Sequence, residues 1–152
     1  MGVGLVINFR QNRSETALEK GQVEALGMEY ISIPWSAHGE PSNAKVAGFL
    51  EAIRAHPTTK VFVHCKLGAD RTGVMVAAYR IAVQQEKVAD AISEMKRFNF
   101  HSFWHPQLAR YVRSLPYLLQ NEKAFENLAA LDNRPHPTPL QESSAQIRTE
   151  DK

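Results

Sequence analysis

The sequence has little of what several classes of protein require. Its single cysteine, Cys65, cannot form an internal disulfide, which excludes the secreted disulfide-rich scaffolds. No apolar stretch approaches the roughly 20 residues that a membrane-spanning helix needs, and the start of the chain lacks a charged signal-peptide region. The formal net charge of +2 demands neither nucleic acid nor a membrane surface as a partner. We therefore expect a cytoplasmic protein with no nucleic-acid partner and no stable membrane insertion.

Hydrophobic periodicity predicts the order of secondary structure. Apolar or alternating runs predict strands over residues 5–9, 29–33 and 60–64, and the third run is apolar enough for a central, buried strand. Helical spacing predicts helices between the strands and several after them, one opened by Pro106. This order predicts an α/β fold: a central, mainly parallel sheet flanked by helices in three layers.

Capping residues predict where the first two helices begin and end. Thr16 and Glu19 have the spacing of a capping box, which places the start of the first helix near residue 17. Gly27 is a natural left-handed stop for that helix, and Ser42 or Asn43 can cap the second.

The domain is expected to occupy residues 1–131, followed by a polar, proline-containing tail over 132–152 that has little to bury and is predicted to be disordered. The first predicted strand begins almost at Met1, which leaves the sheet without an N-terminal cover. We therefore expect that a segment is missing ahead of this chain.

The most specific feature is a run that joins the third predicted strand to the next helix. At such a junction, backbone N–H groups converge and the helix N-terminus adds positive potential, which suits a tetrahedral anion. The same field can lower the pKa of a thiol and make it nucleophilic. The run reads His64-Cys65-Lys66-Leu67-Gly68-Ala69-Asp70-Arg71-Thr72-Gly73.

Individual residues of the run suit phosphoryl chemistry. Gly68 permits a tight turn, and Arg71 offers a planar fork that matches two phosphate oxygens. The Thr72 hydroxyl can hydrogen-bond the Cys65 sulfur and steady it as a leaving group. The alternative is a buried, inert cysteine beside a glycine turn.

Cys-x5-Arg followed by Thr-Gly and preceded by His resembles the protein tyrosine phosphatase superfamily, and the compact size resembles its dual-specificity branch of bacterial type. The resemblance spans roughly residues 5–115. It implies a phosphocysteine intermediate on Cys65, a phosphoryl group held by Arg71, and no metal or cofactor. It also implies that His64 orients the cysteine and that Thr72 assists breakdown of the intermediate. The substrate phosphate would lie among the backbone amides of Lys66, Leu67, Gly68, Ala69, Asp70 and Arg71.

A proton donor for the leaving group is harder to find. The family supplies an aspartate from a loop after the second strand, but the corresponding loop here (residues 34–41) has none, and no aspartate precedes Asp70. Three candidates remain. Glu40 lies in the right loop, His38 can donate near neutral pH, and Asp70 lies within the motif, where the alternative is a carboxylate that stabilises the loop. The fourth possibility is that no protein group serves as the acid.

These residues favour a phosphatase acting on a phosphorylated protein or a small phosphomonoester, with phosphotyrosine as the expected substrate and phosphoserine or phosphothreonine as further ones. Lys66 and Asp70 favour a rival, a phosphoinositide or inositol phosphate phosphatase, whereas Ala69 disfavours it because related lipid phosphatases often carry lysine there. The missing loop aspartate motivates a rival of another class, a phosphate-binding module with little turnover. His101 and His105 lie where the family often orients water, although a structural role is favoured for both.

Overall fold

The computed structural model describes residues 2–129 of the chain, which form three strands, six α-helices and one 3₁₀ turn. No helix among them is both long and apolar enough to cross a membrane. The predicted tail over 132–152 and its boundary at residue 131 lie outside the described residues. The elements are β1 (Leu5–Asn8), α1 (Arg13–Ala25), β2 (Glu29–Ser32), α2 (Asn43–Ala55), β3 (Val61–His64), α3 (Asp70–Ala82), α4 (Val88–Arg97), α5 (Pro106–Asn121), η1 (Lys123–Phe125) and α6 (Glu126–Ala129).

The three strands form a parallel sheet in the order β2-β1-β3, as the predicted α/β fold requires. The prediction that the third strand is central is wrong. β1 occupies the middle and is buried along its whole length, whereas β3 lies at the edge of the described sheet with Phe62 52% exposed. An apolar run cannot reveal this order, because it depends on which side of β1 each crossover helix returns the chain.

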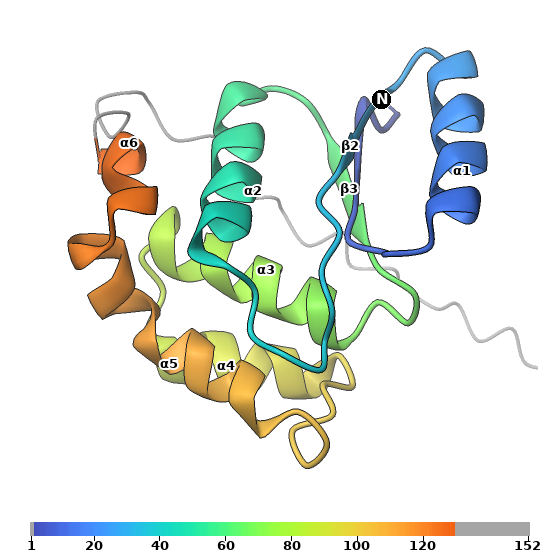
Figure 1. The fold of residues 1–152 in the computed structure, drawn as a ribbon. Coiled ribbons are helices and arrows are strands. Elements are labelled where there is room, and N and C mark those ends of the chain that lie inside the picture. Colours follow the sequence, from blue (N-terminus) through green and yellow to red (C-terminus); the bar gives the residue numbers. More distant parts are fainter. Residues whose placement is uncertain (1, 130–152) are drawn as a thin grey trace, which may run out of the picture.

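Helices cover both faces of the sheet, so the predicted three layers are present (Figure 1). α1 packs alone on one face, over a small cluster that contains Val6, Val23 and Tyr30. The other helices pack on the opposite face around the main core. Because side chains alternate along a strand, Leu5 and Ile7 of β1 point into the main core while Val6 points toward α1.

The helix ends follow from local hydrogen bonds, and one prediction is wrong. α1 begins at Arg13, a turn earlier than the predicted start near residue 17, because the Asn12 side chain accepts a hydrogen bond from the Glu15 N–H and caps the helix there. The predicted stop is confirmed: α1 ends at Ala25 and Gly27 follows with φ +77°. Ser42 caps α2, as predicted.

α3 runs through the middle of the helical layer and directly follows the loop after β3. It packs against α2, α4 and α5. Its buried side chains include Val74 and Met75, both with no exposed surface. α3 is therefore anchored in the main core, and this packing positions the loop that precedes it.

Candidate active site

The loop between β3 and α3 has the geometry that the sequence predicts for an anion site. β3 ends at His64 and α3 begins at Asp70, so residues 65–69 form a tight strand-to-helix turn. We call this turn and the first two residues of α3 the cradle loop (residues 65–71). Gly68 lies at its apex with φ +70°, in the left-handed region that favours glycine. Lys66 and Leu67 are exposed and Ala69 is buried.

Cys65 is a free thiol, 8% exposed, at the start of the cradle loop. Burial by itself would raise its pKa. The nearby Thr72 hydroxyl and the backbone N–H groups of Thr72, Leu67 and Gly68 outweigh that effect, and the pKa of Cys65 lies below its ordinary value. These groups thus favour the thiolate, the form that acts as a nucleophile.

Arg71 is anchored to the carboxyl ends of the neighbouring strands. Its Nη1 donates to the carbonyl oxygen of Phe9 at 3.0 Å and to that of Trp35 at 3.3 Å. Within residues 2–129 its Nε and Nη2 make no hydrogen bond, so these N–H groups remain for an oxyanion. The two backbone carbonyls hold the guanidinium where β1 and β2 end.

His64 lies between the cradle loop and α1. Its Nδ1 is 3.3 Å from the carbonyl oxygen of Cys65. Its buried Nε2 is at ion-pair distance, 2.9 Å, from Glu19 Oε1 but makes no hydrogen bond to any described residue. The imidazole therefore links the residue after it to a carboxylate on a helix far away in the sequence.

Asp70 is held by the connection between α4 and α5 rather than by Lys66. Its Oδ1 accepts a hydrogen bond from the backbone N–H of His101 at 2.8 Å, and its Oδ2 lies 3.0 Å from Nδ1 of the same residue. His105 Nε2 is 3.9 Å away. These contacts tie the first residue of α3 to the 98–105 connection, which agrees with the loop-stabilising alternative for Asp70. No group of three His, Cys, Asp or Glu side chains in residues 2–129 is arranged to hold a metal ion.

The loop after β2 (residues 34–41) is fixed beside the same connection. Gln107 Nε2 donates to the Ala37 carbonyl oxygen at 3.0 Å, and the rings of His38 and His105 lie 6.2 Å apart. Glu40 is exposed. Its charge is felt by Tyr111, whose pKa is raised first by burial and then by Glu40 and Glu122. His38 therefore lies near the residue that precedes α5, and the charge of Glu40 reaches α5 itself.

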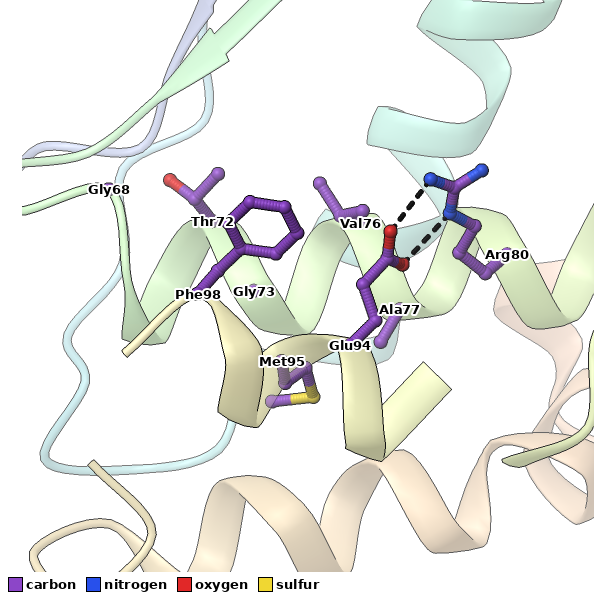
Figure 2. A pocket seen from close by; sticks show the side chains of 9 residues that line it. All are labelled: Gly68, Thr72, Gly73, Val76, Ala77, Arg80, Glu94, Met95 and Phe98. Carbon is purple, nitrogen blue, oxygen red and sulfur yellow. Dashed lines mark hydrogen bonds and ion pairs between the residues drawn. The ribbon is translucent and has the colours of Figure 1, made fainter. Parts of the chain in front are cut away.

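A groove of about 300 Å³ runs along α3 and α4 beside the cradle loop (Figure 2). Gly68 and Thr72 lie at one end, and the Arg80–Glu94 ion pair, with Nη2 and Oε1 2.8 Å apart, closes the other. Its lining includes neither Cys65 nor Arg71. The groove therefore adjoins the back of the cradle loop rather than its anion-facing side.

Sequence reasoning missed the residues that reach this site from outside the motif. Glu19 was assigned only to a capping box, yet it contacts His64. Asn8 and Tyr30 hydrogen-bond to Glu19 and attracted no prediction. A polar residue in an otherwise apolar strand, Asn8 at the end of Leu-Val-Ile-Asn, was the available signal.

A family model matches most of the chain. It covers residues 1–111 and is described as a DSP-PTPase phosphatase fused to NAD+ kinase. The matched segment contains the cradle loop, His64 and the 34–41 loop.

Individual proteins agree with this match. The chain is 28% identical over 102 residues to dual specificity protein phosphatase 26 of Mus musculus, and that alignment covers 63% of this chain but only 46% of the relative, so the chain spans about half of its length. A segment of 47 residues, 28% of this chain, is 45% identical to the Homo sapiens phosphatidylinositol phosphatase PTPRQ, of which it covers 2%.

The fold is shared with TpbA of P. aeruginosa, with a TM-score of 0.62, 26% identity and coverage of 78% of this chain and 74% of that one. A cysteine-to-serine variant of TpbA in complex with pTyr aligns with the same TM-score of 0.62, 25% identity and the same coverage, 78% and 74%.

Proposed function

Because this chain belongs to the dual-specificity, DSP-PTPase-type family of the protein tyrosine phosphatase superfamily, we propose that it is a cysteine-dependent phosphatase that hydrolyses phosphotyrosine, with phosphoserine and phosphothreonine as further substrates. The observation that carries the proposal is the free thiol of Cys65 at the start of the cradle loop, where neighbouring N–H groups lower its pKa and where the loop ends at the anchored Arg71. The TpbA variant in complex with pTyr supports the choice of substrate.

In the first step the Cys65 thiolate attacks phosphorus. A sulfur–phosphorus bond forms and the bond from phosphorus to the phenolic or alcoholic oxygen breaks, while that oxygen takes a proton from an acid. The free Nε and Nη2 of Arg71 suit two oxygens of the transferring phosphoryl group, and the amides of residues 66–71 supply further donors. Nothing is oxidised or reduced.

In the second step water attacks the phosphocysteine. The sulfur–phosphorus bond breaks, inorganic phosphate leaves, and the water proton passes to the group that acted as the acid. Thr72 is placed to stabilise the sulfur as it leaves as a thiolate, because its buried hydroxyl lies near that atom and has no hydrogen-bond partner among the described residues.

For the acid we propose Glu40, with His38 as the alternative on the same loop. Asp70 is a poorer candidate because both of its carboxylate oxygens already contact the backbone N–H or the ring of His101 and are not free for a substrate oxygen. Glu40 is exposed and uncommitted to any hydrogen bond among the described residues, so it is available to a substrate oxygen.

A pH–rate profile on an aryl phosphate tests nucleophile and acid together. Cys65→Ser should lose all measurable turnover. Glu40→Gln should fall by roughly 10²–10⁴-fold and lose the decline at high pH, because that decline reports deprotonation of the acid. His38→Gln and Asp70→Asn should keep that decline. Turnover by Cys65→Ser would refute the nucleophile, and an unchanged Glu40→Gln profile would move the acid to whichever variant lost the decline.

A phosphoinositide phosphatase is the second candidate, favoured by the local match to the phosphatidylinositol phosphatase PTPRQ and by the exposed Lys66 beside the nucleophile. Turnover of a phosphotyrosine peptide and of a soluble phosphoinositide should be compared for wild type and Lys66→Ala. If the lipid is preferred and only its turnover depends on Lys66, the second candidate replaces the first.

The rival of another class is a phosphate-binding module with little turnover. It predicts that Cys65→Ser still binds a phosphotyrosine peptide while the wild type releases no phosphate from any substrate tried. Burst release of the aryl alcohol by the wild type would exclude it.

A further inference from the structure

A carboxylate on the α1 face of the sheet is fully supplied with donors, and the proposed mechanism has not used it. Glu19 Oε2 accepts hydrogen bonds from Asn8 Nδ2 at 2.8 Å and from the Tyr30 hydroxyl at 2.9 Å. Its Oε1 is the atom at 2.9 Å from His64 Nε2. Only 26% of the Glu19 side chain is exposed, so both carboxylate oxygens lie against protein groups in a partly dry place.

Strand register explains why these residues meet. Asn8 of β1 pairs with His64 of β3, so both side chains project from the same face toward α1. Tyr30 of β2 projects from that face as well, and its hydroxyl accepts from Asn8 Nδ2 at 2.7 Å. Glu19 reaches down from α1 into this group. The arrangement thus draws on all three strands and one helix.

His64 is placed between two acceptors. On one side is the Glu19 carboxylate, and on the other is the carbonyl oxygen of Cys65, 3.3 Å from Nδ1. A neutral imidazole has one N–H and can satisfy only one of them, whereas the imidazolium donates from both nitrogens. Only the imidazolium presents an N–H to both of these acceptors.

We propose that Glu19 is a positioning residue for the phosphatase reaction: its carboxylate holds His64 as an imidazolium directed at the Cys65 carbonyl, which places a cation next to the nucleophile. The inference deepens the proposed function and rests on it. Asn8 and Tyr30 fix the carboxylate, and removal of its charge should make the thiolate harder to form.

Other ionisable groups near this network are few. Arg10 acts on Tyr30 by its charge but is paired with Glu15, so it does not neutralise Glu19. Burial, and then Glu19 itself, keep the pKa of Tyr30 above its ordinary value despite the opposing hydrogen bond from Asn8, so the hydroxyl stays a donor. Phe62 stacks on the His64 ring at 5.4 Å and adds no charge. Glu19 is therefore the anion that faces His64 among these groups.

Alkylation of the thiol by iodoacetamide across pH measures the effect without any turnover. Cys65 is the only cysteine in the chain, so the rate reports this thiol alone. Glu19→Gln should move the profile to higher pH, with alkylation roughly three- to tenfold slower at about pH 6 and rates that converge at about pH 9, where both thiols are ionised. The matched control is Glu24→Gln, which removes a carboxylate of the same helix whose one ion pair within residues 2–129 is with Lys20.

Two further variants separate charge from structure. Glu19→Asp keeps the charge and Glu19→Gln keeps the shape, so the proposal predicts that Asp recovers part of the rate that Gln loses. A purely structural role would make Asp the more damaging change. In a double-mutant cycle, Glu19→Gln should have no further effect once His64→Asn is present, because Glu19 acts through His64.

The proposal is overturned if the Glu19→Gln profile superposes on that of wild type, if Glu24→Gln moves it equally, or if Asp is worse than Gln. Thermal unfolding of each variant shows whether it is folded. If Glu19→Gln does not fold, the alkylation profile of Glu19→Asp is compared with that of wild type instead. A failure of the proposed function is read elsewhere, as turnover by Cys65→Ser, and would leave the alkylation profile intact.

Discussion

The two faces of the sheet are built from opposite chemistry, although the same three strands supply both. Toward α2–α6 the strands present Leu5, Ile7 and their apolar neighbours, which join a single large core. Toward α1 they present Asn8, Tyr30 and His64, joined by hydrogen bonds and an ion pair to Glu19. Stability and chemistry are therefore divided between the two faces. The apolar face fixes the start of α3, and the polar face reaches His64, the residue before the nucleophile.

The largest expected effect is on the apolar face. Leu50 of α2 has no exposed surface, so Leu50→Ala should leave a cavity and lower the free energy of unfolding by about 2–5 kcal/mol. The matched control, Leu18→Ala on α1, is 67% exposed and should change it by less than about 0.5 kcal/mol. Urea unfolding measures both. Equal losses would contradict the assignment of stability to the main core.

A smaller effect is expected on the polar face. Asn8 has no exposed surface and donates to both Glu19 and Tyr30, so Asn8→Leu should leave buried polar atoms unsatisfied and lower the free energy of unfolding by about 1–3 kcal/mol. The double variant Asn8→Leu with Glu19→Gln should lose less than the sum of the single losses. Additive losses would mean that the two residues are not coupled.

The smallest effect concerns His56, which belongs neither to the main core nor to the polar group around Glu19. His56 ends α2, and its bonds to the Ala52 carbonyl and then to Glu29 raise its pKa. A raised pKa in the folded state stabilises the protein at low pH, and this contribution is lost as pH rises through the raised value. His56→Gln should therefore lower the unfolding midpoint by about 1–2 °C at about pH 5.5, and the difference should shrink by about pH 8.5. A difference that grows with pH would contradict a raised pKa of His56 in the folded state.

Local signals in the sequence predicted much of this molecule. Short-range chemistry accounts for the α/β class and for the strand-to-helix position of the Cys65 motif. It also accounts for the end of α1 near Gly27 and the start of α2 at Ser42. The start of α1 differs from the prediction. Asn12 caps the helix one turn before Thr16, so Thr16 and Glu19 lie inside the helix instead of forming a capping box.

The features that the sequence does not predict depend on strand order and register. The edge position of β3 depends on the direction of the crossovers, and the pairing of Asn8 with His64 depends on register. The partner of Asp70 could not be foreseen either, because the fold brings His101 to it from a connection 31 residues later. Contacts of this kind leave no periodicity in the sequence.

The most direct test of the central claim is to trap the covalent intermediate. Wild-type protein should be mixed with an aryl phosphate, quenched within the first turnover and digested, and the peptide of residues 61–66 should be examined by mass spectrometry. The account predicts one added phosphoryl group on Cys65. A phosphoryl group on any other residue, or a stoichiometric burst of the aryl alcohol with Cys65 unmodified, would contradict it.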